Sequence, residues 1–547
     1  MFEQLTDRIK SPFDLGDVKV HPVDRAVIDT HISKSSTMIN QFYSESFLRF
    51  FRFVEMVILL SDSIVVGVDI GTSSIKVEAF DKTGTRLWSG REPLEVESPR
   101  DGWFEQDLRA VYWKVEGLLR ELFRSVPARV VLMGLSSTSP GLAVLDSRGE
   151  PVGKSILWMD RRAVEEAREI EQRLGLEHVY RRTGLRVDPI FTAAKILWFL
   201  RNSPRPEARF FVQPKDYVFH MLTGERLTDY SSLSETLLYT LDGAWFAEML
   251  DLLGLGEDSF FAPEESTRVY PLRGDVAERL GATGREVYVA LGGVDSACAA
   301  LGSGGVESSV VDTTGTSACL DLATERPVVD QLMRFESYRH VAPGRYLLEA
   351  CTPTGGEALR KALELVGDPG GSPDAHLDSL EPSGLLVLPF LSGSRSPDWR
   401  PWLRGAVYGL SLATRRSDLV KAFMEGVALW ERAVLESMEE LGFRVGEVRA
   451  VGGGATLNWA RIKANITGRR FAIPAEREAS ALGAALLAGV GYGVYRGVEE
   501  AVGVVRVESV VEPDEGVRAR YERVYSAFRA LWEMLGSAEL GLDHDLH

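Results

Sequence analysis

The feature that most constrains the fold is a unit that occurs twice: a β-branched strand, a turn rich in glycine and hydroxyls, and a returning strand. In the first copy, residues 64–68 run into Asp69-Ile70-Gly71-Thr72, and residues 75–80 return. In the second, residues 309–312 run into 313–317, and residues 318–322 return. The copies lie about 240 residues apart, whereas solenoid repeats have periods of about 20–50 residues. The sequence therefore predicts two similar domains.

The remaining pattern predicts an α/β fold. We expect further strands at 130–135, 287–292, 385–388 and 448–451, and helices at 418–441 and 479–487. A last helix opens at Pro513 and Asp514, ends near Gly536, and presents an apolar face that should pack on the second domain. A chain of 547 residues suits two or three domains.

Composition excludes several classes of protein. The net charge of −17 makes a nucleic-acid binder improbable, because that affinity comes mainly from Lys and Arg. No apolar run reaches the roughly 18 residues of a membrane span. The three cysteines, Cys298, Cys319 and Cys351, lack CxxC spacing. They indicate neither a disulfide framework nor a zinc site, and we expect a reducing, cytoplasmic compartment.

Residues 1–62 differ from the rest and are expected to be an N-terminal extension, non-native or disordered. An aromatic-rich stretch at 42–60 contains charged residues and lies too far inside the chain to be a secretory signal. Two readings stay open. The stretch is an amphipathic helix that docks on the core, or translation starts at Met56 and residues 1–55 do not belong to the native protein.

The first turn suits an anion and a metal ion. Glycine lets backbone N–H groups approach a phosphate, and neighbouring hydroxyls add donors. An acidic residue at the strand end suits Mg²⁺. The alternative is an ordinary hairpin turn, but the second copy favours two hairpins that hold one nucleoside triphosphate. The predicted phosphate ligands are Asp69, Gly71, Thr72, Ser73, Ser74 and Lys76 in the first copy and Gly315 and Thr316 in the second, with Asp69 also the metal ligand.

Asp295 follows a strand and a glycine pair, Gly292-Gly293, that we expect to leave room for a substrate. There it could accept a proton from a hydroxyl that attacks phosphorus. Its alternative role is a helix N-cap. A third segment, 451–458, opens a strand into glycines ahead of Asn458, which suits contact with a nucleotide base or ribose; Gly453 and Gly454 are the predicted contacts. A GxxxxGK[ST] loop is absent from the sequence.

These motifs resemble those of the FGGY family of carbohydrate kinases over residues 63–535. The segments that carry this resemblance are VVGVDIGTSSIKVEAFD, GWFEQD at 102–107, ILWMDRRA at 156–163, PKDYVFHMLTGERLTDYS at 214–231, GGVDSACAALG, VVDTTGTSACL, FLSGSRSPDWRPWLRGAVYGLSL, AVGGGATLNWARIKANITGR and EASALGAALLAG. The 214–231 segment is similar to the xylulokinase-like branch. Phe423 stands where the C-terminal signature expects a smaller residue.

The resemblance implies two ribonuclease H-like domains of the actin-like ATPase type with a cleft between them. It assigns residues 63–306 to an N-terminal domain for sugar and phosphate, 307–500 to a C-terminal ATP domain, and 501–547 to a helix and tail. It implies transfer of the ATP γ-phosphoryl group to a sugar hydroxyl with Mg²⁺ and Asp295 as base. Gly356, Gly454 and Asn458 would line the adenosine site, and Trp158 would pack against the substrate.

One departure affects the substrate. Where xylulokinases carry Gln-Met-His-Gly and glycerol kinases an Arg-Glu pair, this chain has Ser139, Pro140 and Gly141. We expect Ser139 to contact the substrate, glycerol to be disfavoured, and a ketopentose such as D-xylulose to be the acceptor. Gluconate or another polyol is the alternative. A remote alternative is an actin-like ATPase scaffold that does not transfer phosphate to a sugar. The sequence leaves open whether the protein forms a homodimer.

Overall fold

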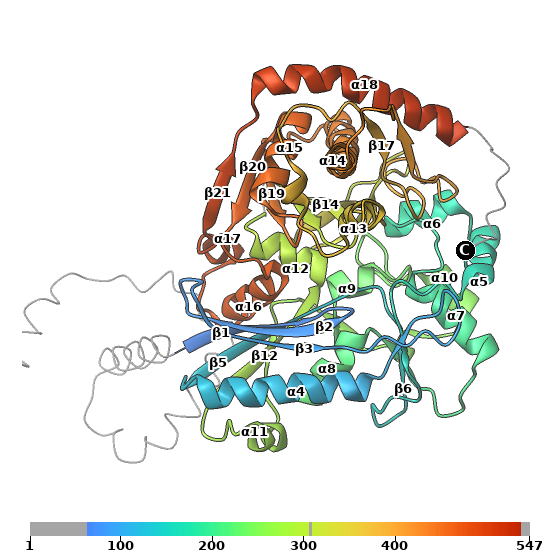
Figure 1. The fold of residues 1–547 in the computed structure, drawn as a ribbon. Helices are drawn as coiled ribbons and strands as arrows, with labels where there is room; N and C mark the ends of the chain where they lie inside the picture. The colour runs from blue at the N-terminus through green and yellow to red at the C-terminus, as the bar shows by residue number, and fades with distance from the viewer. Residues whose placement is uncertain (1–62, 306–308, 538–547) are drawn as a thin grey trace, which may run out of the picture.

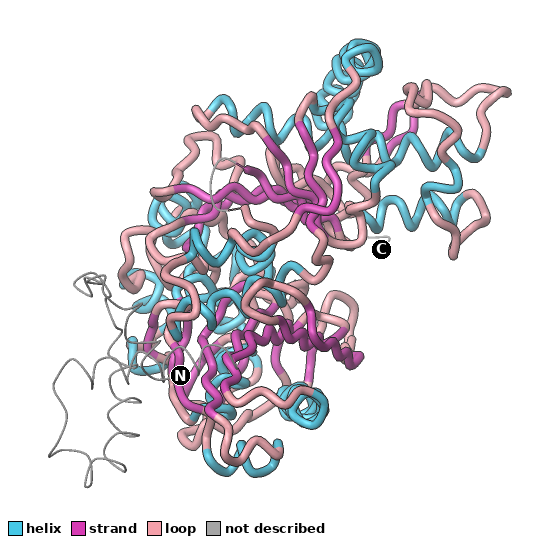
Figure 2. The backbone as a smooth tube through the Cα atoms, turned by 90° about the vertical axis from the view of Figure 1, so that its left-hand side faces the viewer, coloured by secondary structure: helices cyan, strands magenta, loops and turns pink. Residues whose placement is uncertain are grey.

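The computed structural model describes residues 63–305 and 309–537, so the expectations for residues 1–62 lie outside the described part. Two large sheets, of six and seven strands, occupy separate halves of the molecule, with helices between them (Figures 1 and 2). No helix in the described ranges is long and apolar enough to cross a membrane. The predicted α/β class and the two similar sheets are confirmed.

The first sheet has the order β11-β12-β5-β1-β2-β3. Its strands are β1 (Ser63–Ile70), β2 (Ser74–Phe80), β3 (Arg86–Pro93), β5 (Val130–Ser137), β11 (Val269–Pro271) and β12 (Glu286–Val294). β1, β5 and β12 are parallel neighbours, and β1 turns back antiparallel into β2. Every residue of β1 is buried, because α4 (Leu108–Ser125) covers one face of the sheet and α16 (Ala479–Tyr492) the other (Figure 1).

The second sheet has the order β15-β16-β14-β13-β19-β20-β21. Its strands are β13 (Ser309–Thr314), β14 (Ala318–Thr324), β15 (Glu336–Arg339), β16 (Tyr346–Thr352), β19 (Glu447–Val451), β20 (Arg470–Pro474) and β21 (Val507–Val511). The β13–β14 hairpin with parallel β19 repeats the arrangement of β1, β2 and β5. The last helix, α18 (Glu515–Ser537), buries Tyr521, Tyr525, Phe528 and Trp532 in this half, as its periodicity predicts.

Helix α16 follows the second sheet in sequence but packs against the first. A Cβ atom added to Gly67 of β1 would lie 1.8 Å from the carbonyl oxygen of Ala481, and one added to Gly134 of β5 would lie 1.9 Å from that of Ala484. Only glycine allows such a close approach of backbones. α16 also crosses α12 (Asp295–Gly302) at Gly302 and Gly483. The segment that resembles an adenosine-binding motif therefore also joins the two halves.

The remaining elements surround these sheets. The helices are α5 (Val164–Leu174), α6 (Leu176–Thr183), α7 (Thr192–Asn202), α8 (Pro214–Thr223), α9 (Tyr230–Ser234), α10 (Ala247–Leu253), α11 (Gly274–Leu280), α13 (Gly356–Leu365), α14 (Arg416–Glu440), α15 (Leu457–Thr467) and α17 (Val498–Val502), with short 3₁₀ turns at Glu257–Ser259 and Pro373–His376. Two-stranded ladders pair β4 (Glu105–Gln106) with β7 (Ser155–Ile156), β6 (Ala143–Leu145) with β8 (Phe210–Val212), β9 (Leu227–Asp229) with β10 (Ala262–Glu264), and β17 (Leu386–Leu388) with β18 (Ala406–Tyr408).

The expectation that the cysteines form no disulfide is wrong. Cys319 of β14 lies directly opposite Cys351 of β16, with the Cα atoms 4.2 Å apart, and the two sulfurs are bonded. The antiparallel register of the two strands creates this proximity, which cysteine spacing along the chain cannot reveal. Cys298 is free and buried. Cysteine usage therefore no longer supports a reducing compartment.

Candidate active site

The first group of predicted residues gathers where three parallel strands end. Asp69 of β1 and Gly293 of β12 both pair with Ser136 of β5, so the carboxyl ends of the strands bring them together. The Ser136 hydroxyl donates to Asp69 Oδ1 at 2.8 Å. Burial raises the pKa of Asp69, and the nearby Lys76 ammonium opposes the rise.

Lys76 lies between two acidic groups on the returning strand β2. Its Nζ is 3.9 Å from Asp69 Oδ2 and 2.5 Å from Glu478 Oε2. Glu478 precedes α16, so this contact joins the first hairpin to the later part of the chain. Between Asp69 and Lys76, the turn leaves Ser73 exposed and Gly71 and Thr72 half-buried, whereas Ser74 is buried at the start of β2. The exposed part of this turn can meet a ligand.

Asp295 begins helix α12 immediately after β12. Val294 is the N-cap residue, and the Asp295 carboxylate accepts a hydrogen bond from the adjacent Ser296 N–H, at 2.9 Å. An N-cap side chain would bond the second or third amide of the helix, so the capping interpretation of Asp295 is wrong. Burial, and then the Asp69 carboxylate, raise the pKa of Asp295 to about 7. Such a carboxyl is suited to exchange protons near neutral pH.

The glycine pair before Asp295 does not leave room for a substrate, contrary to expectation. Gly292 has a φ of +65°, and an added Cβ would lie 1.6 Å from the Leu135 carbonyl oxygen. At Gly293 an added Cβ would lie 2.2 Å from Ser231 Oγ. The two glycines instead let β12 turn tightly against β5 and α9, which fixes the position of Asp295.

A buried lysine, Lys215, stabilises the turn at Gly292 and Gly293. Lys215 Nζ lies 2.9 Å from Asp229 Oδ1 and 3.1 Å from Asp216 Oδ1, and it donates to the Leu291 carbonyl at 3.1 Å. Asp229 in turn accepts from the Ser231 hydroxyl, which accepts from the Val294 N–H. The PKDY and TDYS motifs therefore hold the backbone that leads to Asp295.

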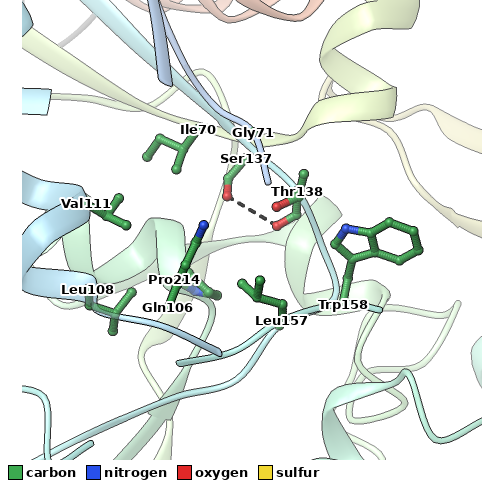
Figure 3. Close-up of a pocket in the computed structure, with 11 residues that line it drawn as sticks. Ile70, Gly71, Gln106, Leu108, Val111, Ser137, Thr138, Leu157, Trp158 and Pro214 are labelled. Carbon is green, nitrogen blue, oxygen red and sulfur yellow. Dashed lines mark hydrogen bonds between the residues drawn. The ribbon is translucent and has the colours of Figure 1, made fainter. Parts of the chain in front are cut away.

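Trp158 and Gln106 line a small cavity (Figure 3) and both contact Thr72. The Trp158 Nε1–H donates to Thr72 Oγ1 at 3.0 Å, and Gln106 Nε2 donates to the Thr72 carbonyl at 2.7 Å. The cavity is lined by Ile70, Gly71, Gln106, Leu108, Val111, Ser137, Thr138, Gly141, Leu157, Trp158 and Pro214. The predicted substrate tryptophan is thus fixed directly to the first phosphate turn.

Lys195 holds the loops around this cavity, a role that sequence reasoning missed. Its fully buried ammonium donates to the carbonyls of Pro140 at 2.9 Å and Leu157 at 2.8 Å. Burial lowers the pKa of Lys195 to about 7. The loop of Ser139 is therefore anchored to the loop of Trp158.

The second group of predicted residues gathers at the β13–β14 turn. Gly315 and Thr316 are exposed in that turn. The Gly356 N–H donates to the Gly315 carbonyl at 2.8 Å, and the Gly454 N–H donates to the Thr314 carbonyl at 2.9 Å. The second phosphate turn and the two predicted adenosine segments therefore lie side by side. Asn458 lies in the first turn of α15, where its side chain accepts from Arg461 at 3.3 Å.

The two adjacent glycines of this group have different surroundings. A Cβ added to Gly454 would lie 2.6 Å from Thr314 Cβ and 3.0 Å from Trp459 Cζ3, whereas one added to Gly453 would meet no atom within 4 Å. Packing inside the protein therefore requires glycine at 454, which corrects the expectation that Gly454 keeps space for the adenine. Gly453 and Gly315 face open space.

Sequence reasoning also missed three buried carboxyl groups near Asp295: Glu235, Asp321 and Glu349. For Asp321 a signal was present, since it lies between two leucines in the strand predicted at 318–322. Acidic side chains are rarely buried without a partner.

Comparison with known proteins agrees with this geometry. Models of the N-terminal and C-terminal domains of the FGGY family of carbohydrate kinases match residues 64–302 and 310–492. A xylulose kinase of Staphylococcus epidermidis is 28% identical over 488 residues, 86% of this chain and 96% of the relative. A glycerol kinase of Thermococcus gammatolerans is 28% identical over 494 residues, 87% of this chain and 99% of the relative.

A solved structure shares the fold. The gluconate kinase of Lactobacillus acidophilus superposes with a TM-score of 0.82 at 22% identity, covering 87% of this chain and 99% of its own. The expected actin-like ATPase fold is thereby confirmed. The family models and the kinase relatives confirm the expected phosphotransferase with ATP as co-substrate. With both domain models matched in order over most of the chain, the protein belongs to the FGGY family of carbohydrate kinases.

Proposed function

We propose that this kinase transfers the γ-phosphoryl group of ATP to a hydroxyl of a ketopentose, with D-xylulose the leading candidate and Asp295 the general base. The observation that carries the proposal is the position of Asp295. Its carboxyl lies at the carboxyl edge of the first sheet, close enough to Asp69 for that carboxylate to raise its pKa. A base with a pKa of about 7 accepts a hydroxyl proton efficiently at neutral pH.

In this proposal the two turns hold the triphosphate. Gly71, Thr72, Ser73, Ser74 and Lys76 act from the first hairpin, and Gly315 and Thr316 from the second. Gly356, Gly453, Gly454 and Asn458 border the adenosine. Asp69 suits Mg²⁺, because its carboxylate lies at a strand end beside hydroxyl donors and Mg²⁺ prefers oxygen ligands and retained water. The ion would neutralise charge on the phosphates.

The acceptor is proposed from the chain's own residues. The xylulose-kinase relative and the PKDY and TDYS motifs support a pentulose. Ser139 and Pro140 cannot supply the Arg-Glu pair expected of glycerol kinases, which argues against glycerol despite the glycerol-kinase relative. The gluconate-kinase structure keeps gluconate as the second candidate. The use of ATP as co-substrate supports a cytoplasmic location for the enzyme. Membership of a carbohydrate-kinase family argues against the remote alternative, an actin-like ATPase that does not transfer phosphate to a sugar.

The test replaces the proposed base. Asp295→Asn should lower kcat for D-xylulose by about 10²–10⁴-fold with ATP affinity almost unchanged. Asp146→Asn, which alters an aspartate in a surface turn, is the matched control. Near-normal turnover by Asp295→Asn would show that the role is wrong. ADP release that no pentulose, aldonate or polyol accelerates would refute the proposed reaction.

A further inference from the structure

Three carboxyl groups form a row across neighbouring strands of the second sheet. Asp321 of β14 lies directly opposite Glu349 of β16, and Glu349 lies directly opposite Glu336 of β15. Side chains at opposed positions project from the same face of a sheet. Arg395 Nη2 lies 2.7 Å from Glu336 Oε1 and neutralises that end of the row. Asp321 and Glu349 form no ion pair with any residue in the described ranges.

The Asp321 end of this row is fully buried and has no cation partner among the described residues. The group that faces the Asp321 carboxyl is the carboxyl of Glu349. Burial, and then the Glu349 carboxylate, raise the pKa of Asp321 well above its ordinary value. Burial disfavours the charged form of this carboxyl, and buried polar groups without a hydrogen-bond donor are rare. The arrangement therefore lowers the stability of the fold, which is typical of residues kept for a ligand.

A fourth carboxyl reaches the row from the other half of the molecule. Glu235 follows α9 and is buried, and its Oε2 has no partner among described groups. Burial, and then Glu349, raise the pKa of Glu235, while the Ser139 hydroxyl opposes the rise. Glu235 is thus close to both Glu349 and Ser139. Ser139 is the position at which this chain lacks the larger polar side chains of its relatives.

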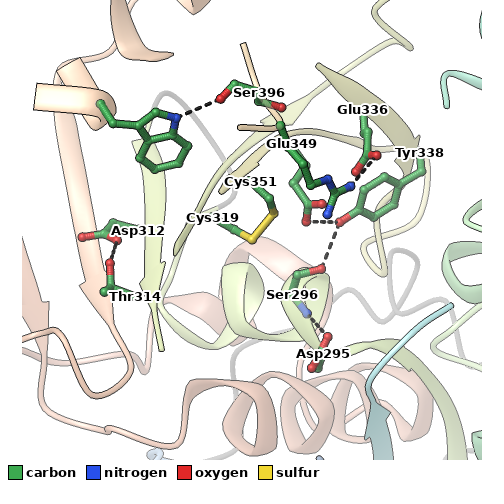
Figure 4. The surroundings of a disulfide bond; sticks show 12 residues. Asp295, Ser296, Asp312, Thr314, Cys319, Glu336, Tyr338, Glu349, Cys351 and Ser396 are labelled. Carbon is green, nitrogen blue, oxygen red and sulfur yellow. Dashed lines mark hydrogen bonds and ion pairs between the residues drawn. A yellow bond between two sulfur atoms is a disulfide. The ribbon is translucent and has the colours of Figure 1, made fainter. Parts of the chain in front are cut away.

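Figure 4 shows Glu349 and Tyr338 close to Ser296 and Asp295. Along β14, Cys319, which is bonded to Cys351, lies between Asp321 and the turn that carries Thr316. At the other end, the Tyr338 hydroxyl donates to Glu349 Oε2 at 2.8 Å and lies 2.9 Å from Ser296 Oγ. Ser296 is the residue after Asp295. Glu349 is therefore connected through Tyr338 and Ser296 to the proposed base, and we expect the acceptor to bind in this region, between the base and the second turn.

We propose that Glu235, Asp321 and Glu349 are specificity-determining residues that accept hydrogen bonds from the hydroxyls of the acceptor, which is an uncharged polyhydroxy compound and not a sugar acid. The inference rests on the proposed function and narrows its substrate class. Hydroxyl donors satisfy the free carboxyl oxygens, whereas the carboxylate of an aldonate would be buried beside carboxyl groups where the described cation, Arg395, already pairs with Glu336. Glu235 thereby supplies polar contacts that Ser139 and Pro140 do not.

The experiment measures the ratio of kcat/KM for D-xylulose to that for D-gluconate at saturating ATP. We expect wild-type protein to favour D-xylulose by at least about 100-fold. Glu349→Gln, Asp321→Asn and Glu235→Gln should each lower this ratio by about tenfold or more, chiefly through the KM of the sugar, with the KM of ATP unchanged. Glu431→Gln is the control, because Glu431 is a buried carboxylate of the same half that pairs with Lys463. It should leave the ratio unchanged.

Thermal unfolding provides a readout that does not depend on activity. Because Asp321→Asn keeps the size of the side chain and removes a buried carboxyl group, it should leave the midpoint unchanged or raise it. A lowered midpoint together with an unaltered sugar ratio would show a structural role and overturn the inference. Wild-type preference for gluconate would also overturn it, while the kinase reaction would stand. ADP release that no acceptor accelerates would instead overturn the proposed function, and the inference with it.

Discussion

Neighbouring glycines 453 and 454 offer a matched pair of substitutions that separates nucleotide binding from folding. Both precede α15, in the segment that the resemblance assigns to adenosine. Gly453 is exposed and has no atom within 4 Å of an added Cβ, whereas Gly454 is buried against Thr314 and Trp459. Valine at 453 should therefore project into the space proposed for the nucleotide. Valine at 454 should instead disturb the interior.

The geometry sets the magnitudes. A Cβ 2.6 Å from two Thr314 carbons is well inside van der Waals contact, so Gly454→Val should cost about 1–3 kcal/mol through overpacking. For a domain of about 200 residues this lowers the unfolding midpoint by roughly 2–12 °C. Gly453→Val should change stability by no more than about 0.5 kcal/mol, as surface substitutions do. Its KM for ATP should rise at least about tenfold, or about 1.4 kcal/mol of binding free energy.

The assay combines thermal unfolding without ligand with ADP release at varied ATP and fixed sugar. We expect Gly453→Val to unfold at the same midpoint as the wild-type protein and to bind ATP more weakly. We expect Gly454→Val to unfold at a lower midpoint. Gly315→Val, which also enters open space, should behave like Gly453→Val. A folded Gly453→Val protein with wild-type KM for ATP would refute the placement of adenosine beside this segment.

Three further predictions concern the base and its supports. Because burial raises the pKa of Asp295 to about 7, kcat/KM for the sugar should fall tenfold for each pH unit below 7 and should be constant above it. A flat profile from pH 5.5 to 8 would exclude Asp295 as the titrating base. Lys215→Met leaves Asp229 and Asp216 buried without their cation and should cost about 3–5 kcal/mol in chemical denaturation; a loss below 1 kcal/mol would show that the network is not structural. Replacing Cys319 and Cys351 by alanine removes a cross-link over 32 residues and should cost roughly 2–4 kcal/mol, whereas an equal unfolding midpoint with and without reductant would contradict the bond's role.

Local sequence patterns predicted the strands that carry the site, because each pattern depends on neighbouring residues. The apolar run before Asp69, the glycine turn and the return strand lie in β1 and β2 as expected. The periodicity at 418–441 likewise gave α14, which spans Arg416–Glu440. A turn that must bind phosphate is visible in sequence, because its glycine and hydroxyls are adjacent in the chain.

Contacts between distant segments could not be predicted in the same way. The disulfide depends on the register of β14 against β16, and the pairing of Lys215 with Asp229 depends on α8 packing beside β9. The role of Gly454 was misjudged because its neighbour Thr314 is 140 residues away in sequence. A glycine is equally compatible with a ligand and with a close side chain, and only the three-dimensional surroundings distinguish them.

The two hairpins are alike in backbone but differ in how they use their aspartates. Asp312 of β13 accepts from the Thr314 hydroxyl, and its other oxygen lies 2.5 Å from Lys463 Nζ, which also contacts Glu431 at 2.7 Å. These charged groups are all buried, so Asp312 is fully committed to an internal ion-pair network. Among the residues that the structure describes, the Asp69 carboxylate has only the Ser136 hydroxyl as a hydrogen-bond donor and the Lys76 ammonium 3.9 Å away. A carboxylate whose charge is already compensated has little left for a cation, so the repeat supplies two phosphate turns but, in our proposal, a single metal ligand.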